Sequence, residues 1–194
     1  MNHSAISSFI WGTADLLRSS YKQHEYGDII LPFTVMRRLD IVLTPTKQAV
    51  LEESEKEIPA ALKQMKSFDE GVLRDKNLKK AAGQDFYNTS AFTMEDLVKD
   101  ADNIKENITA YIDGFSPEIV DIMENFDIYS VINDLDKTGL LFQVTERFCK
   151  PDVDLSPESV SSADMGDIYE ELIRKFSEAS NETAGEHFSP RDGL

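Results

Sequence analysis

The residues that most often perform chemistry in proteins are scattered along this 194-residue sequence without a recognisable pattern. The histidines, His3, His24 and His187, lie far apart, and none has a partner at the spacing that zinc sites use. Asp152 and Asp154 lack the glycine and the distal glutamate of a calcium loop. We therefore expect no metal site.

Motifs for nucleotide chemistry are also missing from the sequence. No Gly-x-Gly turn and no GxxxxGK[ST] loop occurs, so nothing predicts a phosphate cradle or a dinucleotide site. The single cysteine, Cys149, excludes internal disulfides, and the apolar residues at helical spacing before it favour a buried structural thiol. We assign no catalytic residue and expect no enzyme that is active by itself.

Two groups of basic residues could contact phosphate. Arg37 and Arg38 are adjacent in "VMRRLD", and Lys76, Lys79 and Lys80 follow in a lysine-rich stretch. These five residues are the nucleic-acid-binding candidates, and their setting suits contacts to the backbone better than base readout. The alternative for both groups is a solvated or salt-bridged helix face.

Charge is distributed unevenly along the sequence. The formal net charge is −16, but residues 1–80 carry a balance of +1 and residues 81–194 a balance of −17. Because an acidic surface repels phosphate, any nucleic-acid contact is expected in the first half. The hydrophobic fraction of 41% predicts a folded chain, and no apolar run is long enough to cross a bilayer. With no secretory signal in "MNHSAISSFIWG", we expect a soluble, cytoplasmic protein.

The elements that must position these residues are helical. Apolar residues recur at a 3.6-residue period in three places, namely 6–17, 29–36 and 165–176. Thr93 and Asp96 form a capping box, and Ser-Pro pairs at 116 and 156 mark further helix starts. No segment alternates with period two, so the fold is predicted to be mostly α, with any strand short and peripheral. Residues 60–85 are expected to contain loops and to be mobile.

The composition changes near the end of the sequence. After Phe176, "SEASNETAGE" is small and polar, which is typical of a linker. We therefore predict a helical domain over residues 1–178, with a linker and the first residues of another domain over 179–194. The stretch Ser189-Pro190-Arg191 then resembles a helix start, although no helix follows it.

Several segments, in their order, resemble one known family. They are "FIWGTADLLRSSYKQHEYGDIILPFTVMRRLD", "DFYNTSAFTMEDLV", "AYIDGFSPEIVDIMENF" and "DMGDIYEELIRKFSEASNETAGEHFSPRD". The chain resembles the N-terminal helical domain of the modification (methylase) subunit of type I restriction-modification systems. The resemblance covers nearly the whole chain, and its densest part is "IYEELIRKFSEASNETAGEHFSPR".

The resemblance implies a cofactor, partners and a set of residues. The full-length subunit would transfer a methyl group from S-adenosylmethionine to the N6 amine of adenine in DNA, together with a specificity subunit and a restriction subunit. This domain would serve assembly with the specificity subunit and DNA clamping. The family's junction segment implies that the following residues help to hold S-adenosylmethionine: Glu186, His187, Phe188, Ser189, Pro190 and Arg191.

Two motifs of that family are missing from the sequence. Its Gly-rich cofactor loop and its Asn-Pro-Pro-aromatic motif do not occur, and the latter is needed to hold the flipped adenine. We therefore expect the α/β methyltransferase domain to be missing after residue 194, and this chain alone to be inactive and to bind the cofactor weakly. A free-standing, catalytically inactive helical adaptor or inhibitor of the same complex is the alternative.

Overall fold

The computed structural model describes residues 3–152 and 154–187, with side chains described in the last helix as far as residue 178. Helices make up this part of the chain, and an isolated antiparallel bridge between Asn88 and Phe115 is its single β feature. The α-helices are α1 His3–Leu17, α2 Tyr26–Leu43, α3 Lys47–Glu55, α4 Ala60–Lys63, α5 Glu70–Ala82, α6 Met94–Leu97, α7 Ile104–Asp113, α8 Pro117–Asn125, α9 Ile128–Lys137, α10 Leu141–Phe148 and α11 Ser162–His187. Three 3₁₀ turns, Gln23–Glu25, Thr44–Thr46 and Ala101–Asn103, join some of them. The prediction of a mostly α fold is confirmed.

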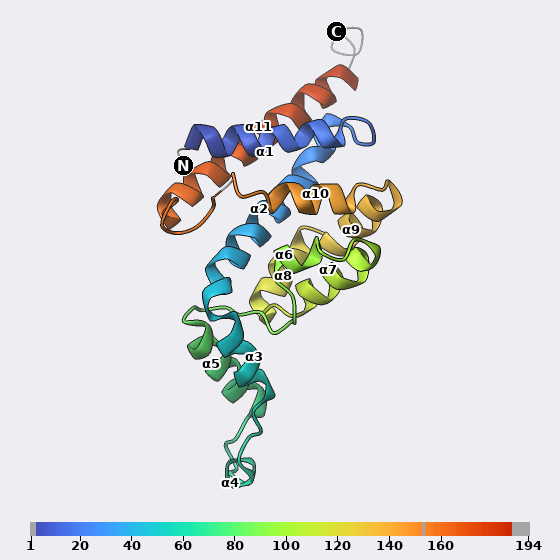
Figure 1. Cartoon of the computed structure of the whole chain (residues 1–194). Helices are drawn as coiled ribbons and strands as arrows, with labels where there is room; N and C mark the ends of the chain where they lie inside the picture. The colour runs from blue at the N-terminus through green and yellow to red at the C-terminus, as the bar shows by residue number, and fades with distance from the viewer. Residues whose placement is uncertain (1–2, 153, 188–194) are drawn as a thin grey trace.

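Helix α2 is central to the fold. It packs against α1 and α11 at one end of the molecule and against α9 and α10 along its length (Figure 1). The apolar stripes predicted for α1, α2 and α11 face this core, which buries Ile10, Phe33 and Leu172 completely or nearly so. Burial of such side chains contributes about 1.5–3 kcal/mol each to folding. Pro32 lies inside α2.

The short helices α6 to α10 form a compact group on one side of α2 (Figure 1). Phe148 of α10 joins this group to the helices around it, since its ring lies 5.7 Å from Phe33 and 6.2 Å from Phe9. Cys149 follows directly and is half-buried, and burial raises the pKa of its thiol to about 12. A thiol with this pKa carries little thiolate at neutral pH, in agreement with a structural role.

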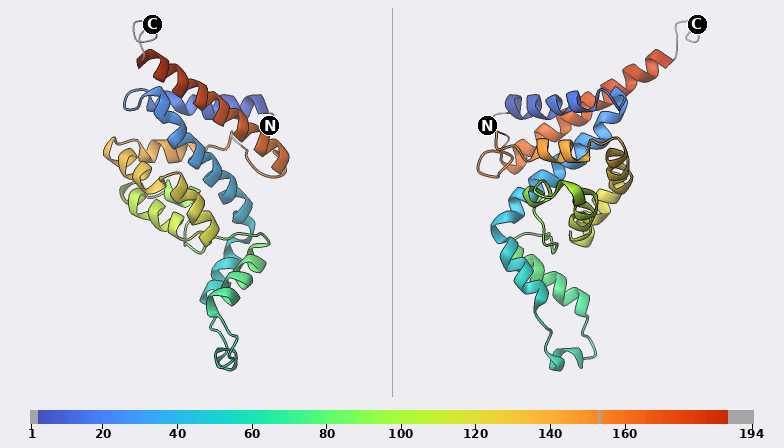
Figure 2. Two further views of the ribbon diagram at one scale, coloured as in Figure 1. Left: turned by 180° about the vertical axis from the view of Figure 1, so that it is seen from behind. Right: turned by 45° about the vertical axis from the view of Figure 1, so that its right-hand side comes forward.

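Helices α3, α4 and α5 form an arm that projects from the rest of the molecule (Figure 2). We call residues 47–82 the arm and the remaining described residues the body. Residues 60–85 contain a loop at 64–69, as predicted, but they also form two helices that the sequence did not predict, α4 and the 13-residue α5. Asp69 caps the first turn of α5 by accepting a hydrogen bond from the Val72 amide, and Gly83 ends it in the left-handed conformation.

Four further expectations concern helix boundaries. The capping box of Thr93 and Asp96 is present, and α8 begins at Pro117 as predicted. Ser156-Pro157 opens a turn in which the Ser156 carbonyl accepts hydrogen bonds from the amides of Ser159 and Val160, but no helix follows there. Helix α11 runs through residue 178 without a break, because the linker-like residues include good helix formers such as alanine and glutamate. The predicted domain boundary is therefore not a helix end and stays a prediction.

No helix in the part of the chain that the structure describes is both long and apolar enough to cross a membrane.

Candidate nucleic-acid and partner interface

Arg37 lies inside the protein rather than on its surface. Its Nη1 donates to Asp40 Oδ2 at 3.1 Å, and its Nη2 lies 3.8 Å from Glu95 Oε1. The side chains of Arg37 and Asp40 are 8% and 5% exposed. Arg37 is therefore a salt-bridged residue, as in the alternative given above, but it is buried rather than solvated. Its guanidinium is committed to a carboxylate that has no other basic partner at ion-pair distance among the described residues.

Asp40 connects three helices. Besides Arg37 on α2, its Oδ1 accepts hydrogen bonds from the Met94 amide at 3.0 Å and from the Tyr111 hydroxyl at 2.9 Å. Burial raises the pKa of Asp40, and these donors and the Arg37 charge oppose that rise. Sequence reasoning missed Asp40. The available signal was a carboxylate three residues after an arginine on a mostly apolar helix.

Arg38 points to a different part of the body. Its Nη1 donates to the carbonyl oxygens of Leu155 and Val160, both at 2.7 Å. These residues belong to the segment between α10 and α11, so Arg38 fastens that segment to α2. Burial lowers the pKa of Arg38, against the opposing charge of Glu158. The two adjacent arginines thus hold separate parts of the body.

The three candidate lysines lie on α5 but differ in their surroundings. Lys79 is ion-paired with Asp75 at 3.0 Å and with Glu118 of α8 at 3.2 Å, and hydrogen bonds to these carboxylates raise its pKa. Lys76 and Lys80 are exposed, and neither forms an ion pair within the described residues. Four residues apart on a helix, they lie on the same side of α5. The structure therefore brings Lys76 and Lys80 together on the arm and separates them from the two arginines.

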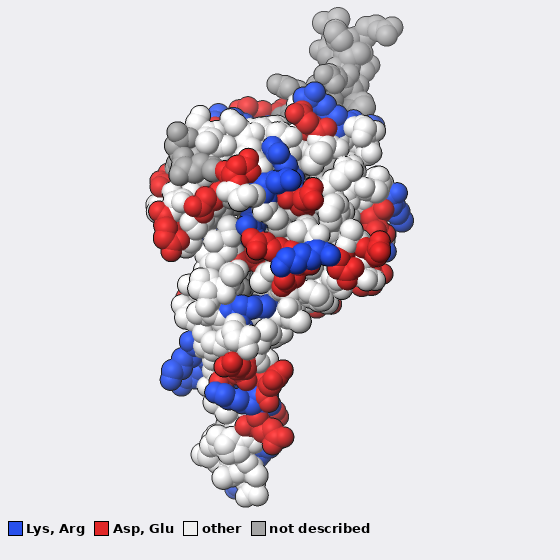
Figure 3. Space-filling view, viewed as in Figure 1, with Lys and Arg blue, Asp and Glu red and all other residues white. Residues whose placement is uncertain are grey.

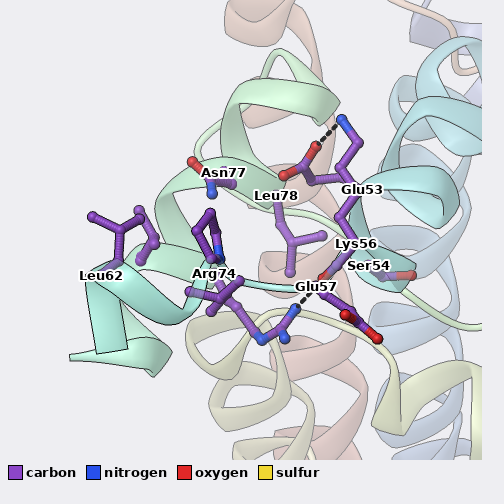
Figure 4. A pocket seen from close by; sticks show the side chains of 11 residues that line it. Glu53, Ser54, Lys56, Glu57, Leu62, Arg74, Asn77 and Leu78 are labelled. Atoms are coloured by element: carbon purple, nitrogen blue, oxygen red, sulfur yellow. Dashed lines mark hydrogen bonds and ion pairs between the residues drawn. The ribbon is translucent and has the colours of Figure 1, made fainter. Parts of the chain in front are cut away.

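A hollow of about 290 Å³ lies between α3 and α5 near α4, and its side chains come from both sides (Figure 4). Arg74 crosses it, donating to the Lys56 carbonyl at 3.2 Å while its Nε binds Glu70. Glu53 pairs with Lys56 on the opposite side at 2.9 Å. The hydrogen bond from Arg74 to Lys56 links the outer end of α3 to α5.

Lys47 fastens the base of the arm to the body. Its Nζ donates to Asn88 Oδ1 at 3.0 Å and lies 3.5 Å from Ser90 Oγ. Burial lowers the pKa of Lys47 to about 8, although the charges of Asp40 and Asp96 oppose this. Sequence analysis did not identify this residue, because its partners are 41 and 43 residues away along the chain.

The segment expected to hold the cofactor is only partly described. Glu186 and His187 are the last two residues of α11. Phe188, Ser189, Pro190 and Arg191 lie outside the described residues, so their assignment stays a prediction. No group of His, Cys, Asp or Glu that could hold a metal ion occurs in the part of the chain whose side chains are described.

Comparison with protein families decides what kind of domain this is. The family model described as the HsdM N-terminal domain matches residues 6–148, from α1 to the end of α10. The chain belongs to this family. It is the N-terminal region of a type I restriction-modification methylase subunit, and its helical fold agrees with that assignment. Searches of curated proteins and of solved structures found no match.

Membership of the HsdM family carries further implications. The family implies use of S-adenosylmethionine by the full-length protein and partners within a type I complex. Helix α11 lies beyond the matched region, which ends at Phe148. The resemblance of α11 to the family therefore depends on its own sequence and not on this match.

Proposed function

We propose that this HsdM N-terminal domain serves the assembly of a type I modification complex and helps to hold that complex on DNA. The arm would contact the DNA backbone, while base recognition and methyl transfer to adenine N6 would belong to the specificity subunit and to the methyltransferase domain. The observation that carries this proposal is the position of Lys76 and Lys80, exposed and without ion pairs in the described residues.

The distribution of charge supports a contact through the arm. Residues 60–84 contain six lysines and arginines against three acidic residues, whereas the chain as a whole has a net charge of −16. On the body, acidic side chains are numerous on the face drawn in Figure 3. A projecting basic element on an acidic domain can approach phosphate while the body stays away from it.

The test uses the methylase assembled with its specificity subunit, because the domain alone is expected to bind DNA poorly. The double variant Lys76→Gln/Lys80→Gln should weaken DNA binding about equally for target and non-target sequences. The slope of log Kd against log salt should fall by about 2, since each lost phosphate contact accounts for about 0.9. Fluorescence anisotropy at several salt concentrations measures both effects.

A matched control separates this contact from a general change in charge. Lys99→Gln removes one exposed lysine from the body, where Lys99 pairs with Asp96 at 3.6 Å. It should leave the salt slope unchanged. An unchanged slope in the Lys76→Gln/Lys80→Gln complex would refute the DNA contact proposed for the arm.

We also propose that Glu186, His187 and the four residues that follow contribute to the S-adenosylmethionine site of the full-length protein. The support is their match to the family's junction segment. Calorimetry with the 194-residue chain should detect no tight binding, because the family's Gly-rich cofactor loop does not occur in this sequence. Micromolar or better affinity would contradict the dependence on the methyltransferase domain.

A further inference from the structure

The end of the arm exposes apolar side chains that nothing in the described structure covers. Leu62, Met65 and Val72 are 36%, 56% and 67% exposed. Together with the half-buried Phe68 they line a shallow hollow of about 300 Å³, which we call the tip patch. In the part of the chain with described side chains, the other exposed large apolar residues are Ile122 and Ile173, which lie on separate helices.

The position of the tip patch explains why the described residues of the body leave it exposed. The patch lies on α4, the start of α5 and the turn between them, at the far end of the arm from the body (Figure 2). No part of the body reaches this end. A grouped apolar surface of this kind is typical of an interaction site, and Met65 can adapt its shape to a partner.

The charges around the tip patch define the partner's chemistry. Lys63 and Lys66 are exposed beside it, and Lys76 lines it, whereas Asp69 is the one acidic residue in its lining. Asp69 is also partly engaged as the cap of α5. The complementary surface would therefore present an exposed apolar side chain among carboxylates.

Helix α8 carries such a surface on the same chain. Ile122 is 42% exposed, and its exposed neighbours along the helix include Asp121 and Glu124. We propose that two copies of this domain associate, with the tip patch of each copy on α8 of the other. This interaction goes beyond the DNA contact proposed above, and the two surfaces share only Lys76, which lies at the edge of the tip patch.

The geometry of the arm allows both contacts to form at once. The ion pair between Lys79 and Glu118 places α8 beside the C-terminal part of α5, near the base of the arm. If two arms lie side by side and point in opposite directions, the tip patch of each copy reaches α8 of the other copy. With 13 residues, α5 is about 20 Å long, which separates the two contacts. A twofold arrangement of this kind closes on itself and uses both patches.

The test measures self-association of the 194-residue chain by sedimentation equilibrium, without DNA, so that its outcome is independent of the phosphate contact. The unmodified chain should form a dimer with a dissociation constant of about 100 µM or lower. Val72→Glu and Ile122→Lys should each weaken dimerisation at least about tenfold. Ile173→Lys alters the exposed apolar residue on α11 and should leave the dimer unchanged.

A charge exchange tests the pairing of the two surfaces. Lys63→Glu/Lys66→Glu and Asp121→Lys/Glu124→Lys should each be monomeric, because like charges then meet at both contacts. Mixing the two variants should restore a dimer, because opposite charges face each other again at both contacts. A monomeric unmodified chain, or a mixture that stays monomeric, would overturn the proposal. Circular dichroism confirms that each variant is folded.

Discussion

Arg37 and Asp40 form an ion pair inside the domain, with 3.1 Å between Nη1 and Oδ2 and less than a tenth of either side chain exposed. The pair lies one helical turn apart on α2, and Asp40 also accepts from Tyr111 of α7 and from the Met94 amide of α6. The carboxylate therefore joins the central helix to two helices more than 50 residues away. Because this carboxylate is buried, it depends on the positive charge of Arg37 for compensation.

Replacing Arg37 should strongly destabilise the domain. Arg37→Met leaves the buried Asp40 carboxylate without its cation, a change that costs about 3–5 kcal/mol in comparable sites. Urea unfolding followed by circular dichroism measures the loss. Arg18→Met is the matched control, since Arg18 pairs with Asp15 on the surface and contributes at most about 1 kcal/mol. Equal effects of the two substitutions would show that the buried pair is not important for stability.

Lys47 should make the free energy of unfolding depend on pH between about 8 and 10.5. Its pKa falls from 10.5 to about 8 in the folded state, so between these values the unfolded chain binds the additional proton. The free energy of unfolding should therefore rise with pH from about 8 to 10.5 because of this residue. Below pH 8 the charged amine is held at a cost, which its hydrogen bonds to Asn88 partly offset.

Lys47→Met removes this dependence. The difference in unfolding free energy between the unmodified chain and Lys47→Met should shift in favour of the unmodified chain as pH rises from 8 to 10. Because Lys47 is only partly buried, the shift should be on the order of 1 kcal/mol. Groups that titrate in both proteins cancel in this difference. A difference that is constant over the range would place the folded-state pKa near its ordinary value.

Arg74 should control how firmly the arm is closed. Arg74→Ala removes the hydrogen bond to the Lys56 carbonyl, which links the outer ends of α3 and α5. Loss of about 1 kcal/mol of local stability should raise the rate of cleavage by proteinase K within residues 56–69 about fivefold. Lys76→Ala lies on the same helix without such a contact and is the control. Cleavage in the body instead, or equal rates for both variants, would contradict this role.

The sequence predicted the parts of this fold that depend on local periodicity. The stripes of α1, α2 and α11 follow a 3.6-residue period, so their buried residues could be named in advance. Helix α5 was missed because it buries only Leu78 and Ala82 and therefore has no apolar stripe. Its signals were the end groups Asp69 and Gly83, which fit the ends of a helix.

The candidate interface was harder to predict for a related reason. A basic pair such as Arg37 and Arg38 has the same sequence whether it faces DNA, solvent or a buried carboxylate. Their partners, including the carbonyls of Leu155 and Val160, are set by contacts up to 122 residues away. Lys79 and Lys80 are likewise adjacent, yet Glu118 neutralises the first and leaves the second exposed. Only the tertiary structure separates these cases.

Two glycines test the packing of α11 against α2. A Cβ on Gly27 would lie 3.1 Å from Cβ and Cγ of Phe176, which also packs on Trp11 with ring centroids 4.7 Å apart. Gly27→Ala should therefore push α11 from α2 and lower the free energy of unfolding by about 1–3 kcal/mol. Gly166 in α11 has nothing within 4 Å of such a Cβ, so Gly166→Ala should raise it by up to about 1 kcal/mol through helix propensity. Thermal unfolding of both variants measures these opposite changes in stability. A loss of stability in both variants would mean that the loss in Gly27→Ala cannot be assigned to the contact with Phe176.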